Sequence, residues 1–234
     1  KIVATLGPAT SSKEILRKML QEGVNVFRIN FSHANYDDVR ERIKMIRELN
    51  EEDGFNAAIL GDLQGPKLRV GVMKEEVVVN EGDRIVFATG KQFKGTAERV
   101  FMNYDSFPKD VKAGERILLD DGKLIFEVVK TNKKDEVETK VIQGGPLKSK
   151  KGVNLPNTNI SLPALTEKDV KDAKFACEMG VDWMALSFVR HAEDLMELQE
   201  LIKKHSKYKI PIVAKIEKPE GVENIDKIVA YCDG

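Results

Sequence analysis

The sequence predicts an α/β fold that combines part of a parallel (β/α)8 barrel with an inserted all-β barrel domain. Strand-like and helix-like segments alternate at both ends of the 234-residue chain, whereas its middle carries only short alternating runs. Neither glycine-rich phosphate fingerprint of open nucleotide-binding sheets is present, and this favours a barrel. The predicted domains are 1–66 and 164–234, the first and second parts of the barrel domain, and 67–163, the insert.

The barrel-like parts predict five parallel strands, which lie at residues 1–6, 24–31, 57–63, 183–188 and 210–216. Amphipathic helices are predicted between Ser12 and Gly23 and over 37–53, 166–179, 193–205 and 221–231. Serine and threonine caps precede two of these helices, and glycines follow three of them. Because a closed barrel needs eight strands, five of them leave two unpaired edges, and the sequence predicts a truncated barrel.

The middle of the chain predicts short strands and no amphipathic helix. The strand-like runs are residues 76–79, 84–88, 99–103, 116–119, 124–130 and 136–143. Turn-forming pairs and triplets separate them, namely Gly82-Asp83, Asp121-Gly122 and Gly144-Gly145-Pro146. This pattern is typical of a small β-barrel.

The composition of the chain argues against several classes of protein. The chain has 38 basic and 38 acidic residues, so its net charge of zero gives no general attraction to nucleic acid or to an anionic membrane. No apolar run approaches the length of a membrane span, and no signal peptide precedes the first strand. Two cysteines, Cys177 and Cys232, form no disulfide framework. We therefore expect a cytoplasmic protein.

Polar residues at the end of the second strand form the first candidate site. Arg28, Asn30 and Ser32 alternate along the segment, and a strand would place them on one face. One interpretation is a structural polar cluster that seals the barrel. The other, which we favour, is an edge that binds anions and cations, because polar groups in an apolar strand are costly to bury without partners.

Three other strand ends carry polar residues that a barrel would bring to the same rim. Asp62 ends the third strand and could equally be a simple turn former. Ser187 ends the fourth strand. Lys215 and Glu217 end the fifth, two residues apart, and could form only a salt bridge. At a barrel mouth the pair suits phosphoryl or enolate chemistry, with Glu217 on a divalent metal and Lys215 steadying negative charge.

These motifs together resemble the pyruvate kinase family. The similar segments run in order along essentially the whole chain: Lys1-Ile-Val-Ala-Thr-Leu-Gly-Pro-Ala-Thr10, Phe27-Arg-Ile-Asn-Phe-Ser-His33, Asp62 with Gly65-Pro66 and Arg69, Ser149-Lys-Lys-Gly-Val-Asn-Leu-Pro156 and Ala214-Lys-Ile-Glu217. The resemblance implies phosphoryl transfer from phosphoenolpyruvate to ADP, giving pyruvate and ATP.

The resemblance also implies roles for individual residues. Lys215 is similar to the lysine that stabilises the enolate, and Glu217 to a carboxylate ligand of the essential Mg²⁺. Arg28 and Ser187 match substrate-binding positions, and a planar guanidinium suits the transferring phosphoryl group. The family's nucleotide-binding positions correspond here to Asn30, Ser32, His33, Arg69 and Lys151.

Lys151 lies at the far end of the β insert, so the resemblance implies that the insert acts as a lid that closes over the site and excludes water. The Asp120-Asp121-Gly122 segment is explained well by a hairpin turn. A contact from Asp121 to the nucleotide is the alternative.

A departure from the family pattern concerns K⁺. The family places this ion among side chains that match Asn30, Ser32 and Asp62. In a nearby segment, the glutamate and threonine usual in the family are replaced here by Lys67 and Val70, a pair similar to that of potassium-independent members. An ammonium can supply the charge of the monovalent cation, so we expect K⁺ to be dispensable. The alternative is that Lys67 extends into solvent.

The resemblance therefore implies pyruvate kinase activity and, for the full-length form, a homotetramer. Another phosphoenolpyruvate- or pyruvate-binding, metal-dependent barrel such as an aldolase is a rival, and the β insert counts against it. A non-catalytic fragment that binds a ligand or partner is the second rival. The family's second Mg²⁺ carboxylate falls beyond Gly234, so we expect the 234-residue chain alone to be inactive.

Overall fold

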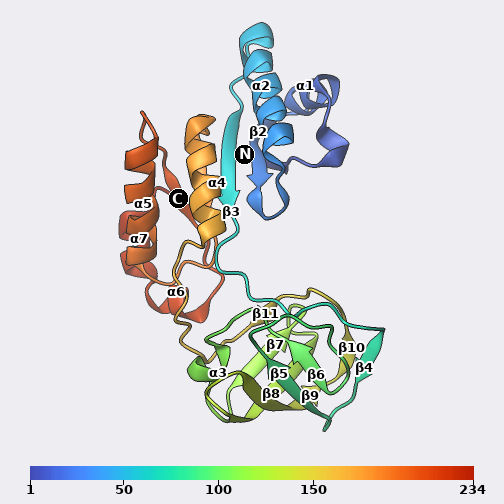
Figure 1. The fold of residues 1–234 in the computed structure, drawn as a ribbon. Coiled ribbons are helices and arrows are strands. Elements are labelled where there is room, and N and C mark those ends of the chain that lie inside the picture. The colour runs from blue at the N-terminus through green and yellow to red at the C-terminus, as the bar shows by residue number, and fades with distance from the viewer. The chain divides into compact units, whose positions relative to one another are not determined.

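A computed structural model describes residues 1–234, which divide into two compact units, 1–66 with 163–234 and 67–162. In the first unit, five parallel strands form one sheet in the order β1-β2-β3-β12-β13. Figure 1 labels two of them, β2 and β3. The bounds of the five strands are Ile2–Thr5, Val24–Asn30, Ala58–Leu63, Trp183–Leu186 and Ile212–Ala214. The strands lie in chain order, with no reversal of the kind at which doubly wound sheets bind ligands. This order makes the sheet a half-barrel.

Six helices accompany this sheet: α1 (Lys13–Gln21), α2 (Tyr36–Asp53), α4 (Glu167–Glu178), α5 (Ala192–His205), α6 (Pro219–Glu223) and α7 (Ile225–Tyr231). Side chains of Ser12, Asn35 and Thr166 accept backbone N–H groups at the starts of α1, α2 and α4. The apolar helix faces join the sheet in one core, which includes Leu16, Leu20, Ile43, Ile46, Leu49, Ala173, Leu195 and Leu198.

The second strand is shorter than the sequence predicts. It ends at Asn30, and residues Phe31–His33 form a single turn of 3-10 helix. The side-chain oxygen of Asn30 accepts the backbone N–H of Ser32 at 3.1 Å and so caps this turn. The prediction that Ser32 shares a strand face with Arg28 and Asn30 is therefore wrong, because Ser32 lies beyond the strand.

The prediction of a single helix over 221–231 is also wrong. It is two helices, α6 and α7, which meet at Asn224, whose backbone (φ −102°, ψ 15°) is not helical. The Asn224 side-chain amide donates to the carbonyls of Arg190 and Glu220, at 3.2 and 2.9 Å. The sequence pattern could not show this side-chain competition with the helix.

The second unit contains a six-stranded sheet in the order β11-β7-β8-β9-β5-β6 and a two-stranded sheet of β10 and β4. The bounds from β4 to β11 are Val77–Val79, Arg84–Ala88, Arg99–Phe101, Arg116–Leu119, Leu124–Thr131, Glu136–Gln143, Gly145–Leu147 and Val153–Asn154. Its core is separate from that of the first unit and includes Phe87, Phe107, Phe126, Val100 and Ile117. The unit thus has the interior of an independent domain.

Two details of the second unit depart from the sequence prediction. A short helix, α3 (Phe107–Asp110), stands where none was predicted. Gly145 and Pro146, predicted as part of a turn, instead pair with β4 as an antiparallel strand. The predicted hairpin at Asp121 is confirmed, because β7 and β8 are antiparallel and are joined through left-handed residues. No helix in the structure is long and apolar enough to cross a membrane.

Candidate active site

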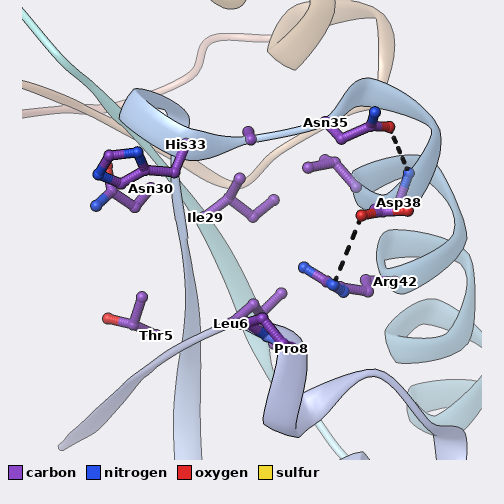
Figure 2. Close-up of a pocket in the computed structure, with 12 residues that line it drawn as sticks. Thr5, Leu6, Pro8, Ile29, Asn30, His33, Asn35, Asp38 and Arg42 are labelled. Atoms are coloured by element: carbon purple, nitrogen blue, oxygen red, sulfur yellow. Dashed lines mark hydrogen bonds and ion pairs between the residues drawn. The ribbon is translucent and has the colours of Figure 1, made fainter.

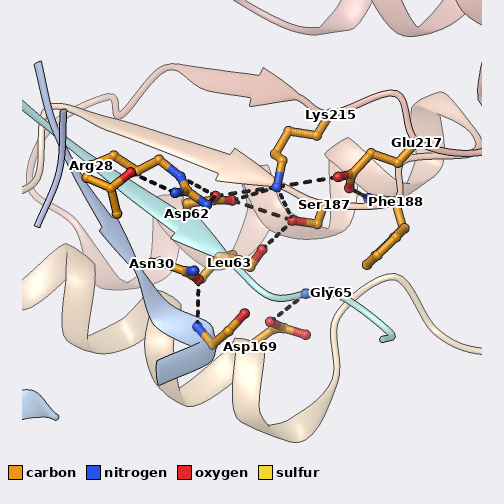
Figure 3. A network of polar contacts seen from close by, with 12 residues as sticks. Arg28, Asn30, Asp62, Leu63, Gly65, Asp169, Ser187, Phe188, Lys215 and Glu217 are labelled. Atoms are coloured by element: carbon orange, nitrogen blue, oxygen red, sulfur yellow. Dashed lines mark hydrogen bonds and ion pairs between the residues drawn. The ribbon is translucent and has the colours of Figure 1, made fainter. Parts of the chain in front are cut away.

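Asp62 is the centre of a polar network at the carboxyl end of the half-barrel sheet (Figure 3). It is 3% exposed and lies near the end of β3. Its Oδ2 accepts the Nε–H of Arg28 at 2.7 Å, and its Oδ1 lies 3.2 Å from Nζ of Lys215. The three residues come from β2, β3 and the segment after β13, which parallel pairing brings to one end of the sheet.

Ser187 connects this network to the end of β3. Its hydroxyl donates to the Leu63 carbonyl at 2.7 Å and accepts from Nζ of Lys215 at 2.8 Å. Ser187 is buried directly after β12, so its position is fixed by the sheet. Lys215 is thereby held by two partners, Asp62 and Ser187, with its side chain 31% exposed toward the strand ends.

Glu217 is next to this network and is more open, with a side chain 38% exposed. Its Oε2 accepts the backbone N–H of Phe188 at 3.1 Å, and its Oε1 lies 3.8 Å from Nζ of Lys215 (Figure 3). The carboxylate is therefore oriented by a main-chain donor, while one oxygen retains free lone pairs. An exposed, oriented carboxylate of this kind can serve as a metal ligand.

The network has the charge balance of an anion site. Arg28 and Lys215 share one buried carboxylate, Asp62, which leaves one positive charge in excess among these three residues; Glu217, 3.8 Å from Lys215, offsets this charge unless it binds a cation itself. Both side chains are only about a third exposed, at 29% and 31%, so water screens them less than it would on an open surface. The arrangement can bind a phosphoryl or carboxylate group and can stabilise negative charge that develops on it.

Sequence reasoning missed several contributors to this network. Thr5, at the end of β1, accepts Nη1–H of Arg28 at 2.9 Å. Gly65, after β3, donates its N–H to Asp169 at 3.0 Å. A survey of every polar strand end would have included Thr5. Asp169 was predictable only as a helix cap, a role it does fill at α4.

Asn30 and His33 line a pocket of about 330 Å³ with Thr5, Pro8 and Arg42 (Figure 2). The wall of this pocket opposite the strand is polar, because it contains Asp38 and Arg42 of α2, whose charged groups lie 4.0 Å apart. Ser32 belongs to the 3-10 turn between Asn30 and His33. Of the predicted residues, Asn30 and His33 thus line one cavity, whereas Ser32 does not.

Arg69 and Lys151 lie together in the second unit. Arg69 is bridged to Gly152, and its Nη1 donates to the Lys150 carbonyl at 2.8 Å. The Lys151 ammonium lies 2.9 Å from Oδ1 of Asp120, and this hydrogen bond lowers the pKa of that carboxyl. Two predicted nucleotide contacts thus lie on paired loop segments of this unit, next to the isolated bridge between Arg69 and Gly152.

The structure also shows the surroundings of Asp62, Lys67 and Val70, the residues on which the potassium prediction depends. Asp62 has both carboxylate oxygens in contact with Lys215, so here it neutralises cationic side chains. In the second unit, Val70 is buried, and the main-chain carbonyl of Lys67 accepts from Asn103 at 3.2 Å. No group of three or more His, Cys, Asp or Glu side chains that could hold a metal occurs in the structure.

Comparison with known proteins identifies the family. The family model described as "Pyruvate kinase, barrel domain" matches residues 1–234. The pyruvate kinase of Clostridium perfringens is 41% identical over 235 aligned residues, which cover 100% of this chain and 49% of the relative. Those of Corynebacterium efficiens and Thermotoga maritima are 42% and 41% identical, again over 100% of the chain.

The chain spans about half the length of the curated relatives it matches, or less, as with the 40% covered of the Bacillus licheniformis pyruvate kinase. The match is nevertheless continuous over both structural units, including the β insert that interrupts the half-barrel. This chain belongs to the pyruvate kinase family.

Proposed function

We propose that this chain is part of a pyruvate kinase that transfers the phosphoryl group of phosphoenolpyruvate to ADP. The observation that carries the proposal is the Arg28–Asp62–Lys215–Ser187 network beside Glu217, in a chain of this family. It supplies an excess of positive charge and an oriented carboxylate where an anionic substrate would bind. The reaction breaks the bond from phosphorus to the enol oxygen and forms one to the terminal oxygen of ADP.

In this proposal Lys215 stabilises the enolate of pyruvate. The electron pair of the broken bond stays on the enol oxygen, where the ammonium of Lys215 offsets the new charge until C3 takes up a proton. Ser187 and Asp62 hold the ammonium in place, at 2.8 and 3.2 Å. Arg28 binds the transferring phosphoryl group with the guanidinium N–H groups that its ion pair with Asp62 orients.

Glu217 would hold the Mg²⁺ ion, which lowers the negative charge on the phosphoryl oxygens when bound. The donor chemistry fits, because Mg²⁺ in phosphoryl-transfer sites takes one or two carboxylates together with substrate oxygens and water. Glu217 provides one such carboxylate at an exposed position. Asp62 does not compete for the ion, since two cationic side chains already occupy its oxygens.

We further propose that Asn30, Ser32 and His33 bind ADP with Arg69 and Lys151, and that the second unit acts as a lid. The pocket beside Asn30 and His33 supports this assignment. Asn30, Ser32 and Asp62 form the monovalent cation site of the family, whose positive charge Lys67 replaces here. Val70 is consistent with a site that does not need K⁺.

The fold of the whole protein is proposed as a closed (β/α)8 barrel. The edge of the sheet at β13 supports this, since residues after α7 already pair with it: Asp233 donates to Ile212 and Ala214 to Gly234, both at 2.9 Å. The other strands, a second Mg²⁺ carboxylate and a C-terminal region would belong to a longer polypeptide. Such a protein would be a cytoplasmic homotetramer.

A coupled assay of phosphoenolpyruvate and ADP turnover tests the proposal. The full-length polypeptide should turn over, and Lys215→Met should reduce kcat by roughly a hundredfold or more, the cost of removing a transition-state charge partner. Lys227→Met, at an exposed lysine of α7, is the matched control and should leave kcat unchanged.

Two rival functions give different results in the same assay. A metal-dependent aldolase of the same barrel type would show no ATP formation. A non-catalytic fragment is what we expect of the 234-residue chain alone, so turnover by that purified chain would refute the view that it needs further residues.

A further inference from the structure

Lys218, which directly follows Glu217, is a buried lysine with no hydrogen-bond partner for its ammonium group. The residue is 7% exposed. Burial lowers its pKa below the usual value, and nearby Arg190 acts in the same direction. Burying an ammonium group without a hydrogen-bond partner is costly, and a side chain of the same length without charge would fill the space at lower cost.

The ammonium of Lys218 lies over the ring of Phe188, with Nζ 6.0 Å from the ring centroid. This distance is at the outer limit of cation–π attraction, which strengthens when the pair is removed from water. The carboxylates of Glu220 and Glu217 also attract the charge. The aromatic ring is therefore the group that Lys218 faces directly.

Phe188 has an unusual backbone, with φ of 59°. This left-handed conformation is uncommon and costly for a bulky side chain, so surrounding contacts must maintain it. Gly65 leaves room for this turn: a Cβ there would lie 2.7 Å from the Ser187 carbonyl oxygen and 3.2 Å from Cδ2 of Phe188. The Lys218 ammonium, over the ring, is a group that can hold the side chain in this position.

The left-handed turn has a consequence for Glu217. In this conformation the backbone N–H of Phe188 donates to Oε2 of Glu217 at 3.1 Å (Figure 3). Because this is the main-chain hydrogen bond that orients the carboxylate, a rotation at Phe188 would displace or break it and release Glu217 from this orientation. The chain of contacts runs from the Lys218 ammonium to the Phe188 ring, to its amide and to the carboxylate.

We propose that Lys218 is a positioning residue for metal binding, which holds Phe188 in the left-handed turn that orients Glu217. The inference rests on the proposed function, because it assumes that Glu217 binds the divalent ion. It assigns Lys218 no contact with substrate or metal.

Direct metal binding tests this role in the full-length polypeptide. Free Mn²⁺, which shares the oxygen preference of Mg²⁺, is measured by electron paramagnetic resonance during titration. Lys218→Met should raise the Mn²⁺ Kd roughly tenfold, equivalent to about 1.4 kcal/mol. Its melting temperature should stay the same or rise, since an apolar side chain replaces an unpartnered buried charge. Amide exchange at Phe188 should become faster.

Two further variants separate positioning from space filling. Lys218→Arg keeps a cation that can stack on Phe188 and should hold the Mn²⁺ Kd within about threefold of the wild type. Lys227→Met removes an exposed lysine charge from the same part of the chain and should not change the Kd. In a Phe188→Leu background, itself weaker in Mn²⁺ binding, Lys218→Met should cause little additional loss.

The outcomes distinguish the two proposals. If the wild type binds Mn²⁺ and turns over while Lys218→Met binds equally well, the positioning role is wrong and the proposed function stands. If the wild type neither binds Mn²⁺ nor turns over, both are wrong. Should Lys218→Met fail to fold, the Phe188→Leu variant decides. An unchanged Mn²⁺ Kd in Phe188→Leu overturns the positioning role. A tenfold rise in that Kd, together with a wild-type-like Kd in Lys218→Arg, supports it.

Discussion

At the scale of single residues, Gly65 lies where a side chain would collide with the end of the neighbouring strand. Its φ is +66°, and a Cβ would approach the Ser187 carbonyl oxygen to 2.7 Å. Gly180 has almost the same φ, +65°, but no atom within 4 Å of its Cβ position. A side chain added at either glycine would therefore strain the backbone, but only at Gly65 would it also collide with neighbouring atoms.

We predict that Gly65→Ala lowers the free energy of unfolding by about 2–4 kcal/mol, because it combines left-handed strain with overpacking. Gly180→Ala should cost only about 1 kcal/mol, from strain alone. Urea unfolding of the two variants measures both values. Equal losses would show that the backbone at Ser187 moves aside without cost.

The role of Asp62 also belongs to this scale. Its place at a strand end predicts a site residue, and the resemblance implies a ligand of a monovalent cation. The structure gives it 3% exposure and two cationic neighbours, Arg28 and Lys215. A buried carboxylate satisfied by two cations orients them both, and this arrangement depends on side-chain directions that the sequence pattern does not contain.

At the scale of elements, α4 shows how one helix serves both the core and the site. Its Thr166–Asp169 capping box closes the first turn, and Asp169 also accepts the N–H of Gly65 after β3. Its apolar face buries Cys177 in the core of the half-barrel. The sequence predicts the cap and the apolar face, but the bond to Gly65 joins residues that are far apart in the chain.

We predict that the two cysteines differ in reactivity. Burial, with a smaller effect from Glu178, raises the pKa of Cys177 to about 11. Its neutral thiol is thus favoured by folding, so this stabilisation is present below the ordinary pKa of 9 and is lost as the pH rises from 9 towards 11. Labelling with a thiol reagent at pH 8 should modify Cys232, which is half-buried, and leave Cys177 intact until the protein unfolds. Equal labelling rates in the folded protein would contradict this.

At the scale of the whole molecule, the chain leaves the half-barrel unit after residue 66, forms a second unit with its own core, and returns to the half-barrel unit at residue 163. Residues 67–162 are continuous in sequence, and their sheet pairing is complete within the unit. The half-barrel unit, in contrast, is made of two separate segments.

We predict that residues 67–162 fold alone, because their apolar core needs no contribution from the other unit. The isolated segment should give dispersed amide resonances and a cooperative thermal transition. Residues 1–66 alone should give neither, since β3 would lose its pairing with β12. Poorly dispersed amide resonances for the isolated 67–162 segment would show that its fold depends on the rest of the chain.

Dependence of activity on K⁺ can be measured only on the full-length protein. We predict that the full-length protein works equally well in sodium-only and potassium-only buffers, within about twofold, because Lys67 supplies the charge of the ion. Lys67→Glu should make activity depend on K⁺. Lys94→Glu, the same charge change at an exposed lysine of the second unit, should not. A large potassium stimulation of the wild type would refute the prediction.

The sequence by itself determined the five strands of the half-barrel, most helix starts and the strand ends that carry the site. These features follow from local patterns, namely apolar periodicity, caps and glycine positions. The tertiary structure decided the break at Asn224, the 3-10 turn that removes Ser32 from its strand and the left-handed turn at Phe188. Each involves a contact between distant segments: Asn224 with Arg190, the Phe31 carbonyl of the 3-10 turn with Lys168, and Phe188 with Glu217 and Lys218. Local propensity does not encode such contacts, so they are determined only when the strands have been brought side by side.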